Sequence, residues 1–404
     1  MRIGLLADVY KPFMSGVTNF VSQHKQALEE LGHKVFVFTL GNIDYEDQEP
    51  LVYRSAAIPL TETGYQFGFV YSRLARRKVK TMDLLHAQQP FISGSLALTY
   101  GKRHYIPVIF TYHARYDKLA SHYVPVLPDG VSGTLLGAYL SWFANQCQAV
   151  TTPTRAIHQL MREYGVTVRM PVIPNGVDLA PFRSPPRLLT RSELKLPAEA
   201  KVSVYVGRIA PEKNLAFLLR SFSRVQRKIP EAHLLIVGHG PEEADLHDQA
   251  RELGIARHIT FTGQVPYEQV PDYLALSDLF VTASVIEVQP LSIIEGLAAG
   301  LPAVAITSDA VVDTLTDGHD SLLASYSAKD LAARWTSALS DDDLRARLSL
   351  NAQESSRRYD IHRTAAQMAQ VYQEVIEDYK LEQKEREDEG VLSTIKRQIM
   401  GDKE

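Results

Sequence analysis

Short apolar runs alternate with helical patterns along nearly the whole chain. In the first half, Arg2–Ala7, Lys34–Leu40, Asp83–Ala87 and Pro107–Tyr112 are apolar stretches, and segments with helical spacing such as Val17–Leu31 separate several of them. Strands that are apolar throughout, rather than at alternate positions, are typical of a parallel sheet covered by helices on both faces. We therefore expect an α/β fold with a doubly wound parallel sheet.

The pattern starts a second time after an irregular stretch. Pro174–Asp178 (PNGVD) breaks regular structure, and the proline-rich segment 181–186 that follows is typical of a domain boundary. A new series then begins, with strands expected at residues 202–206, 232–237, 258–261, 279–282 and 303–306. The sequence thus predicts two doubly wound, Rossmann-like domains, 1–178 and 179–360, followed by a helix and charged tail, 361–404, that can pack back on the first domain. Ligands bind such sheets outside the carboxyl ends of their strands.

The last part of the chain is highly charged. A helix is expected over 361–380, a solvated helical extension rich in Glu and Lys over 381–388, and a basic, apolar end over 391–400. Because terminal residues are poorly ordered unless something ties them down, we expect fraying at this end rather than attachment to a surface.

Composition excludes several classes of protein. The chain is 45% hydrophobic and 22% charged, which is typical of globular domains and argues against disorder. The longest apolar stretches, such as Leu297–Thr307, are shorter than the roughly 18 residues of a membrane-spanning helix, and residues 1–4 already begin a strand. The single cysteine, Cys147, cannot form an internal disulfide, so we expect a packed thiol in a reducing compartment. No spanning helix, no cleavable signal and a cytoplasmic location are therefore expected.

The segment Gly207–Asn214 (GRIAPEKN) lies between an expected strand and an expected helix. At such a turn, backbone N–H groups and the positive end of the helix dipole bind phosphate. Arg208 and Lys213 add two positive charges to the same turn, so the segment favours a diphosphate ligand. A strand-to-helix turn with two surface cations and no ligand has the same appearance, so this segment alone does not decide the function.

Two carboxylates delimit the segment Glu287–Glu295 (EVQPLSIIE), which follows another expected strand. If the helix begins near Leu291, Glu287 lies in the loop at the cleft and Glu295 lies about one turn into the helix. A carboxylate accepts two hydroxyl hydrogen bonds, so the pair suits the diols of a sugar and a ribose. The alternative is an ordinary loop acid followed by an early-helix acid stabilised by the helix dipole.

Taken together and in this order, these segments resemble the donor half of the GT-B nucleotide-sugar glycosyltransferases, specifically the large retaining group called family 4. The resemblance covers nearly the whole chain. Its six landmarks are Gly16, His113, Pro174–Asp178, Gly207–Asn214, Gly238–Pro241 and Glu287–Glu295. It implies the GT-B fold, in which two Rossmann-like domains face each other across a cleft, the first binding the acceptor and the second binding the nucleotide-sugar donor.

The resemblance also implies roles for individual residues. Arg208 and Lys213 are expected to hold the diphosphate and to neutralise the leaving nucleoside diphosphate, so that no metal or other cofactor is required. Glu295 is expected to bind the ribose hydroxyls, and Glu287 the donor sugar near its C3 hydroxyl. His113 is expected to contact the transferred sugar through its main-chain carbonyl and, at the C6 hydroxyl, through its ring. His113, Arg208, Lys213 and Glu287 are accordingly the predicted catalytic residues.

Further donor contacts are expected from glycines and backbone amides. Gly16 has no side chain, so it lets the first loop approach the β-phosphate or the acceptor closely. The backbone amides of Gln289 and Leu291 are expected to touch the sugar or the phosphate, whereas Pro290 has no N–H to donate. Gly238 completes the predicted donor-binding set.

The implied reaction transfers a hexose with retention of its anomeric configuration. Its transition state resembles an oxocarbenium ion beside a departing diphosphate, so catalysis depends on orientation and on electrostatic stabilisation of that leaving group. No carboxylate stands out as a nucleophile for the β-face. The resemblance suggests front-face departure, in which the leaving phosphate oxygen takes the acceptor proton, and it makes UDP-glucose the default donor.

A lipid acceptor is suggested by the first half of the chain. The segment 112–128 (YHARYDKLASHYVPVLP) resembles the matching part of bacterial diacylglycerol glucosyltransferases, which make glycolipids at the cytoplasmic face of the membrane; Tyr116 and Tyr123 are its candidate acceptor contacts. Residues 1–180 contain 17 Lys and Arg against 13 Asp and Glu, which leaves 26 of the 43 basic and 34 of the 47 acidic residues in 181–404. Of the two halves, the first is the one that could attract an anionic surface, although charge alone favours two solvated halves.

A basic run is the strongest candidate for contact with a membrane. It comprises Arg73, Arg76, Arg77, Lys78 and Lys80, of which Arg76, Arg77 and Lys80 are the predicted contacts with anionic lipid. Together with the apolar segments 64–71 and 135–143, this is typical of a monotopic protein, although a core helix with a solvated basic face has the same pattern. We expect a peripheral protein on the inner face of the cell membrane that binds a nucleotide sugar and no nucleic acid. The sequence does not indicate an oligomeric state.

Three other functions share parts of this pattern. A family 4 enzyme acting on a soluble or polysaccharide acceptor has every donor residue named above. A dinucleotide-binding oxidoreductase is disfavoured because residues 4–16 contain no G-x-G-x-x-G, and Gly238-x-Gly240 lacks the third glycine. A non-catalytic nucleotide-sugar binding protein is expected to have a damaged donor site, whereas all four charged donor residues are present here.

Overall fold

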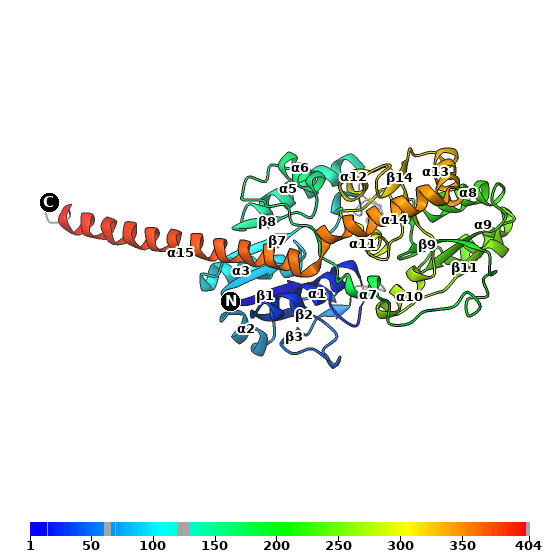
Figure 1. Ribbon diagram of the computed structural model, residues 1–404. Helices are drawn as coiled ribbons and strands as arrows, with labels where there is room; N and C mark the ends of the chain where they lie inside the picture. Colours follow the sequence, from blue (N-terminus) through cyan, green and yellow to red (C-terminus); the bar gives the residue numbers. More distant parts are fainter. Residues whose placement is uncertain (14, 60–65, 69, 119–128, 401–404) are drawn as a thin grey trace.

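The computed structural model describes residues 1–404 except 14, 60–65, 69, 119–128 and 401–404. The chain forms two α/β lobes, each built around a parallel sheet, and a long C-terminal helix runs from the second lobe along the first (Figure 1). The predicted fold class, two doubly wound domains in series, is confirmed.

The first lobe contains a six-stranded parallel sheet in its described part, in the order β3-β2-β1-β6-β7-β8. Its strands are β1 (Arg2–Ala7), β2 (Lys34–Leu40), β3 (Val52–Ser55), β6 (Leu84–Ala87), β7 (Val108–Thr111) and β8 (Ala149–Thr151), and the short strands β4 (Ile58–Pro59) and β5 (Gln66–Phe67) pair outside the sheet. The strand order reverses between β1 and β6, which is where sheets of this kind bind ligands.

Helices cover both faces of this sheet. Its apolar side chains form one core with α2 (Arg73–Val79), α3 (Ile92–His104), α5 (Asp129–Ala144) and α6 (Arg155–Glu163), and another with α1 (Gly16–Glu30) and the start of α15 (Ile361–Met400). Ser15 caps α1 by accepting a hydrogen bond from the Thr18 backbone N–H at 3.1 Å. The central strands are largely apolar because helices cover both faces of the sheet.

The second lobe repeats this arrangement with the order β11-β10-β9-β12-β13-β14. Its strands are β9 (Lys201–Val206), β10 (Ala232–Val237), β11 (Ile259–Phe261), β12 (Leu279–Thr282), β13 (Ala303–Ile306) and β14 (Ser321–Ala324). The five strands predicted for this half are confirmed, and β14 was not predicted. Here too the strand order reverses beside the first strand, between β9 and β12. A ligand of this sheet is therefore expected at the loops that follow these two strands.

The helices of the second lobe also divide between two faces. They are α7 (Ala180–Arg183), α8 (Leu215–Gln226), α9 (Glu243–Glu252), α10 (Val270–Ala275), α11 (Leu291–Ala298), α12 (Asp309–Thr314), α13 (Ala328–Ser340) and α14 (Asp342–Ser356). The apolar side chains of α8, α9 and α13 form a core on one face, and those of α10, α11 and α12 a core on the other. Trp335 of α13 is fully buried and donates to Ser203 Oγ of β9 at 2.7 Å.

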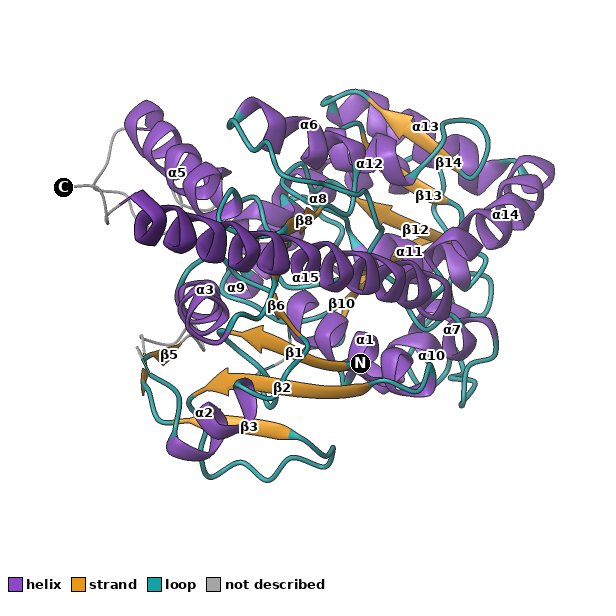
Figure 2. Ribbon diagram, turned by 90° about the vertical axis from the view of Figure 1, so that its left-hand side faces the viewer, coloured by secondary structure: helices purple, strands orange, loops and turns teal. Residues whose placement is uncertain are grey.

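The helix α15 connects the two lobes. A β-bridge joins Val177 of the linker to Asp360, directly before the helix, and Ile361, Met368 and Tyr372 are buried in the core of the first lobe. Figure 2 shows α15 lying across the molecule, with the first sheet beneath it. The helix continues to Met400, so the fraying predicted for 391–400 is not observed, and residues 381–388 consist of strong helix formers that allow this extension.

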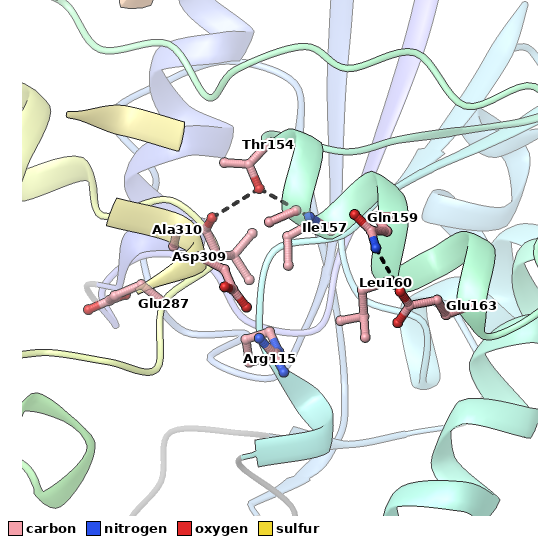
Figure 3. Close-up of a pocket in the computed structure, with 11 residues that line it drawn as sticks. Arg115, Thr154, Ile157, Gln159, Leu160, Glu163, Glu287, Asp309 and Ala310 are labelled. Carbon is pink, nitrogen blue, oxygen red and sulfur yellow. Dashed lines mark hydrogen bonds between the residues drawn. The ribbon is translucent and has the colours of Figure 1, made fainter. Parts of the chain in front are cut away.

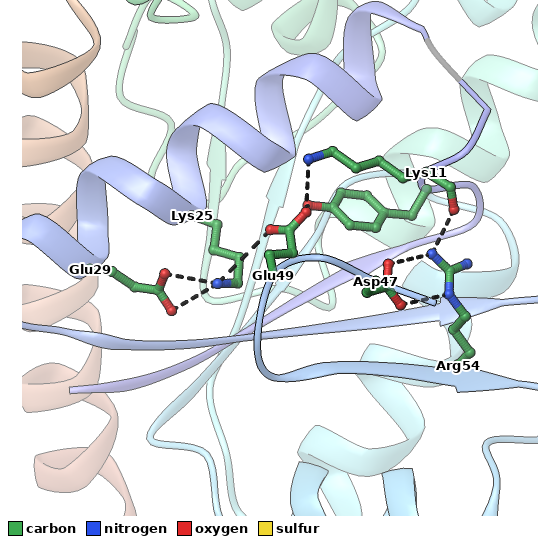
Figure 4. A network of polar contacts seen from close by, with 7 residues as sticks. Lys11, Lys25, Glu29, Asp47, Glu49 and Arg54 are labelled. Atoms are coloured by element: carbon green, nitrogen blue, oxygen red, sulfur yellow. Dashed lines mark hydrogen bonds and ion pairs between the residues drawn. The ribbon is translucent and has the colours of Figure 1, made fainter. Parts of the chain in front are cut away.

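A polar network anchors the first helix to the loop that follows β2 (Figure 4). Lys25 has a side chain only 2% exposed, and its Nζ lies 2.8 Å from Glu29 Oε2 and 3.9 Å from Glu49 Oε2. Glu49 also accepts from the Tyr10 hydroxyl at 2.8 Å and pairs with Lys11 at 2.9 Å. A buried ammonium group is tolerated only when it is paired, so these carboxylates are required where they are.

The same network holds the loop that leads from β1 to α1. Arg54 of β3 forms a two-pronged pair with Asp47, at 2.7 and 2.8 Å, and donates to the carbonyl oxygen of Lys11 at 2.6 Å. Such charge-assisted, bidentate contacts fix geometry as well as adding energy. The loop that precedes Gly16 is therefore held at Lys11 by Arg54.

Candidate functional site

The loop after β9 is shaped by glycines. Gly207 has φ +153°, and Gly238, directly after β10, has φ +143°. A Cβ atom on Gly238 would lie 1.9 Å from Gly207 O, so the two loops touch through their backbones. The N–H of Gly207 donates to Val237 O at 3.0 Å, and that of Gly238 to Gly263 O at 3.2 Å. Gly238 thus shapes the site by letting two loops meet, while its contact with a donor stays a prediction.

Arg208 and Lys213 lie on this loop. The Tyr205 hydroxyl donates to the carbonyl oxygen of Arg208 at 2.9 Å, and residues 211–213 form a 3₁₀ turn, η2 (Pro211–Lys213). Asn214 then adopts a left-handed conformation, with φ 56°, directly before α8. The two predicted phosphate-binding cations are therefore on a turn with a defined shape at the start of a helix, and the Arg208 side chain is exposed.

Lys213 and Glu287 are in direct contact. Lys213 Nζ forms an ion pair with Glu287 Oε1, and Ser284 Oγ lies 2.9 Å from the same carboxylate oxygen. Ser284 Oγ is also 3.2 Å from the carbonyl oxygen of Glu212, so the hydroxyl ties the loop after β12 to the loop after β9. A cation suited to phosphate and a carboxylate suited to sugar hydroxyls thus meet where β9 and β12 end.

Glu295 lies one turn into α11, which begins at Leu291 as predicted. Its side chain is buried, and Oε1 accepts a hydrogen bond from the Tyr267 hydroxyl at 2.9 Å. Burial raises the pKa of this carboxyl to about 7, against the smaller effect of the Tyr267 hydrogen bond, which lowers it. The Tyr267 oxygen in turn accepts from Gln23 Nε2 at 3.1 Å, and Gln23 belongs to α1 of the first lobe. The predicted ribose ligand is therefore held by contacts that cross between the lobes.

The loop between β12 and α11 also contacts the first lobe. Val288 is buried in the apolar core of that lobe, and Thr154 Oγ1 lies 3.5 Å from its carbonyl oxygen. Gln289 Oε1 accepts from the backbone N–H of Asn175, in the linker, at 2.7 Å. The Gln289 side chain thus holds the linker, and the donor contacts predicted for the backbone amides of Gln289 and Leu291 stay predictions.

His113 follows β7 at the carboxyl end of the first sheet. Its Nε2 lies 2.8 Å from Gln88 Oε1, and its ring centroid lies 4.8 Å from that of Phe20. Burial, together with the nearby His24, lowers the pKa of His113 to about 3. The ring is therefore neutral at pH 7 and donates from Nε2 to the amide oxygen. A neutral imidazole can contact a sugar hydroxyl but supplies no charge for a phosphate.

Gly16 is the first residue of α1, directly after the cap Ser15. A Cβ atom at this position would meet no other atom of the described residues within 4 Å. Packing inside the protein therefore does not require a glycine here. The space in front of the α1 N-terminus is compatible with the close approach of a ligand predicted for Gly16.

A pocket lies between the lobes beside Glu287 (Figure 3). The first lobe contributes Arg115, Thr154, Ala156, Ile157, Gln159, Leu160 and Glu163 to its lining, and the second contributes Glu287, Val288, Asp309 and Ala310. Arg115 is paired with Asp117 at 2.7 Å, and the backbone N–H of Ala156 donates to Asp313 Oδ2 of the other lobe at 2.7 Å. The pocket offers hydroxyl-binding groups next to the predicted sugar site.

The two tyrosines predicted to contact a lipid acceptor differ in placement. Tyr116 is only 9% exposed and packs edge-on against Phe91 and Tyr112, with ring centroids 5.2 and 5.3 Å away. Its ring is thus part of the core, so the predicted surface contact does not fit its burial. Tyr123 lies outside the described residues, as do residues 64, 65 and 69 of the predicted apolar segment 64–71, in which Val70 is 56% exposed and Tyr71 is buried.

The predicted membrane contacts of the basic run are exposed. Arg76 and Arg77 of α2, and Lys80 directly after it, face solvent, and Leu74 on the same helix is 57% exposed. On α5, Trp142 is 58% exposed, although other apolar residues of that helix are buried. Leu74 thus shares the exposed face of α2 with the cations, whereas Ala75 and Val79 are buried in the core. Both a membrane-facing helix and a core helix with a solvated basic face have this arrangement, so membrane contact stays a prediction.

Membrane-spanning helices and metal-binding clusters are both absent from the described part of the chain. No helix there has the length and apolar character needed to cross a bilayer. The described residues also contain no cluster of three or more His, Cys, Asp or Glu side chains that could hold a metal ion. Cys147 is buried, as predicted, and burial raises the pKa of its thiol.

Family models and named relatives match both lobes. The model described as "Glycosyltransferase Family 4" matches residues 14–181, and "Glycosyl transferases group 1" matches 187–355. The alpha-monoglucosyldiacylglycerol synthase of Streptococcus pneumoniae is 31% identical over 84% of this chain and 78% of its own length. The chain belongs to glycosyltransferase family 4.

Other relatives and solved structures extend this comparison. The alpha-monoglucosyldiacylglycerol synthase of Acholeplasma laidlawii is 28% identical to this glycosyltransferase over 89% of the chain and 93% of the relative. The structure of HepE from Anabaena, in complex with UDP and glucose, has a TM-score of 0.77 at 19% identity, covering 93% of this chain and all of that one. The predicted GT-B fold is confirmed.

Some residues of the glycosyltransferase site were not predicted from the sequence. Ser284 lies three residues before Glu287, and a hydroxyl so near a site carboxylate is a local signal that could have been used. Tyr267 and Gln23 contact each other across 244 residues of sequence, and no local pattern connects either of them to Glu295.

Proposed function

We propose that this glycosyltransferase moves glucose from UDP-glucose to diacylglycerol, with retention of the anomeric configuration, at the inner face of the cell membrane. The observation that supports this most is the contact between Lys213 and Glu287, because it joins a phosphate-binding cation to a sugar-binding carboxylate at the carboxyl edge of the second sheet. Glu295, eight positions further along the chain, supplies a buried carboxylate for the ribose. Two relatives, 31% and 28% identical over most of the chain, are named alpha-monoglucosyldiacylglycerol synthases.

Binding of the donor has to replace part of the ion pair between Lys213 and Glu287. Without a donor, Lys213 and Glu287 neutralise each other. A nucleoside diphosphate brings negative charge to the turn, so Lys213 exchanges part of its contact with Glu287 for a phosphate oxygen. The carboxylate is then available to accept from the C3 hydroxyl of the sugar. Arg208 on the same turn supplies the second cation, so neutralising the diphosphate needs no metal ion.

The chemical step is a substitution at the anomeric carbon. The bond from this carbon to the β-phosphate oxygen breaks, and its electron pair stays on the diphosphate. The acceptor hydroxyl oxygen bonds to the same face of the carbon, and its proton passes to the departing phosphate oxygen. Lys213 and Arg208 stabilise the charge that develops on this oxygen, and neutral His113 holds the sugar.

The pocket between the lobes is the proposed route for the acceptor hydroxyl. Thr154, Gln159 and Glu163 offer hydroxyl, amide and carboxylate groups to the single free hydroxyl of diacylglycerol, and Glu287 connects the pocket to the donor sugar. A relative from Mycolicibacterium smegmatis, 28% identical over 93% of this chain, is named phosphatidyl-myo-inositol mannosyltransferase, which also indicates a lipid acceptor in its case. The exposed cations of α2 then bring the first lobe to an anionic surface.

A single reaction panel tests this proposal. The purified protein is incubated with labelled UDP-glucose, UDP-galactose and GDP-mannose, with phosphatidylglycerol vesicles that contain or lack diacylglycerol, in the presence and absence of EDTA. We expect labelled glucosyl diacylglycerol, α-configured by NMR, from UDP-glucose alone, at a rate that EDTA leaves unchanged.

Each departure from this result has a distinct meaning. Equal turnover on water-soluble acceptors without vesicles would support the alternative, a family 4 enzyme with a soluble or polysaccharide acceptor. A β-configured product contradicts retention, and loss of activity in EDTA contradicts the metal-independent site. Tight binding of a nucleotide sugar without transfer to any acceptor would favour the remote alternative, a non-catalytic binding protein.

A further inference from the structure

We infer that Tyr267 and Gln23 are positioning residues that hold the Glu295 carboxylate for the donor nucleotide and make its placement depend on the closeness of the two lobes. The inference rests on the proposed function, because Glu295 is the proposed ribose ligand. Tyr267 and Gln23, on different lobes, are uncharged residues that support the charged residues of the donor site.

The contacts form one continuous chain. The Tyr267 hydroxyl donates to Glu295 Oε1 at 2.9 Å and accepts from Gln23 Nε2 at 3.1 Å. Gln23 Oε1 accepts from the backbone N–H of Asp178, at the linker between the lobes, at 2.9 Å. Each donor in this chain therefore meets one acceptor, and the path runs from the linker through α1 to α11.

Burial makes this support necessary. Glu295 is buried on α11, whose neighbouring residues Ile294 and Leu297 belong to an apolar core, and a buried carboxylate without hydrogen bonds is strongly disfavoured. The Tyr267 hydroxyl stabilises the ionised form and fixes which way the carboxylate faces. Because a carboxylate has two oxygens, accepting from Tyr267 at Oε1 is compatible with accepting from a ribose hydroxyl at Oε2.

The position of Gln23 couples this support to the first lobe. Tyr267 is on the 3₁₀ turn η4 (Tyr267–Gln269) of the second lobe, whereas Gln23 is on α1, whose first turn carries Gly16. If the lobes separate, the Tyr267 hydroxyl loses its contact with Gln23 Nε2, and Gln23 can no longer hold both the tyrosine and the linker. Donor binding at Glu295 is therefore favoured in the closed arrangement.

The charged groups that act on the Tyr267 hydroxyl are Glu295 and Asp178. The negative charges of Glu295 and Asp178 act with burial to keep the pKa of Tyr267 far above its ordinary value, so the hydroxyl remains a donor at every working pH. Removing this donor raises the pKa of Glu295, which already stands at about 7, because the hydrogen bond is what lowers it. The ionised carboxylate then forms only at higher pH.

The test is Tyr267→Phe, with KM for UDP-glucose and kcat measured from pH 6 to 9. We expect KM at pH 7 to rise about tenfold, since a hydrogen bond to a charged group is lost, with a much smaller change in kcat. The acid limb of the kcat/KM profile should move to higher pH, so that the deficit shrinks at pH 9. Tyr273→Phe removes a hydroxyl from the neighbouring helix α10 and is the matched control, with an unchanged profile.

Glu295→Gln separates the failure of this inference from the failure of the proposed function. If this variant keeps the wild-type KM for UDP-glucose, the ribose assignment itself is wrong. If it raises KM while Tyr267→Phe does not, or if the pH limb of Tyr267→Phe stays in place, the positioning role is overturned and the donor site stands. Should Tyr267→Phe fail to fold, Gln23→Leu on the other lobe replaces it. This variant keeps the Tyr267 hydroxyl but removes its support, so we expect a rise in KM of about threefold and a smaller shift of the acid limb in the same direction. An unchanged KM and profile would overturn the inference.

Discussion

Replacing Lys213 by alanine tests the donor site most directly, because its two expected effects differ so much in size. In the proposed reaction the ammonium group meets the negative charge that develops on the leaving diphosphate. A unit charge about 4 Å away contributes on the order of 4 kcal/mol at an effective dielectric constant of about 20. That value of the dielectric constant fits a side chain that is 22% exposed, and the corresponding loss in kcat is about a hundredfold to a thousandfold.

Stability should hardly change in the same variant. The side chains of the ion pair between Lys213 and Glu287 are 22% and 17% exposed, and pairs that solvent still reaches contribute up to about 1 kcal/mol. Glu287 also keeps its contact with Ser284 when the lysine is gone. The midpoint of thermal unfolding should therefore shift by only a few degrees, in contrast to the large loss in rate.

The assay is turnover of labelled UDP-glucose on vesicles that contain diacylglycerol, with thermal unfolding measured on the same preparation. Lys228→Ala is the matched control, because this exposed lysine lies just beyond the other end of α8, the helix that follows Lys213. It should retain the wild-type rate. A Lys213→Ala enzyme with kcat within tenfold of wild type and an unchanged unfolding midpoint would refute the assignment of this lysine to the leaving group.

Three further expectations follow from other parts of the structure. Replacing Arg76, Arg77 and Lys80 by glutamate should abolish co-sedimentation with phosphatidylglycerol vesicles, since each cation contributes on the order of 1 kcal/mol. The same replacement of Arg224, Arg227 and Lys228, which are exposed at the end of α8, should leave co-sedimentation unchanged. His24 is neutral when folded because burial lowers its pKa to about 3, so the unfolded state takes up a proton as the pH falls below about 6.5. This residue alone should lower the free energy of unfolding by up to about 1.4 kcal/mol per pH unit in that range, so His24→Gln should weaken the decline in thermal unfolding. Gly238→Ala should lower the free energy of unfolding in urea by roughly 3 kcal/mol or more, because its Cβ would meet Gly207 O at 1.9 Å, and an unchanged midpoint would contradict that contact.

The fold could be predicted from the sequence because its strands are buried on both faces. The bounds expected for the first strand and for 232–237 are those of β1 and β10, where every residue after the first one or two is apolar and buried. The same rule fails for β3, whose residues Val52–Arg54 are only partly buried at the edge of the sheet and include a charged side chain. Edge strands lack the continuous apolar run that identifies central ones.

The site could be predicted in part, and the division has a physical reason. Lys213 and Glu287 each lie in a turn directly after a strand, so sheet topology alone brings them together. Tyr267 contacts Glu295 only because two separate segments fold against each other, and nothing in its neighbours along the chain marks it. Tyr116 illustrates the opposite error, since an aromatic residue near the cleft can equally be a core residue.

The return of α15 to the first lobe affects how the protein can be synthesised. Ile361, Met368 and Tyr372 complete the apolar face that contains Ile3 and Leu5, yet they leave the ribosome after the whole second lobe. Until then the first sheet has one face only partly covered, although domains usually mature in the order of translation. The amino-terminal lobe of this protein therefore finishes folding last, and a nascent or truncated chain ending before residue 361 exposes a surface that invites aggregation.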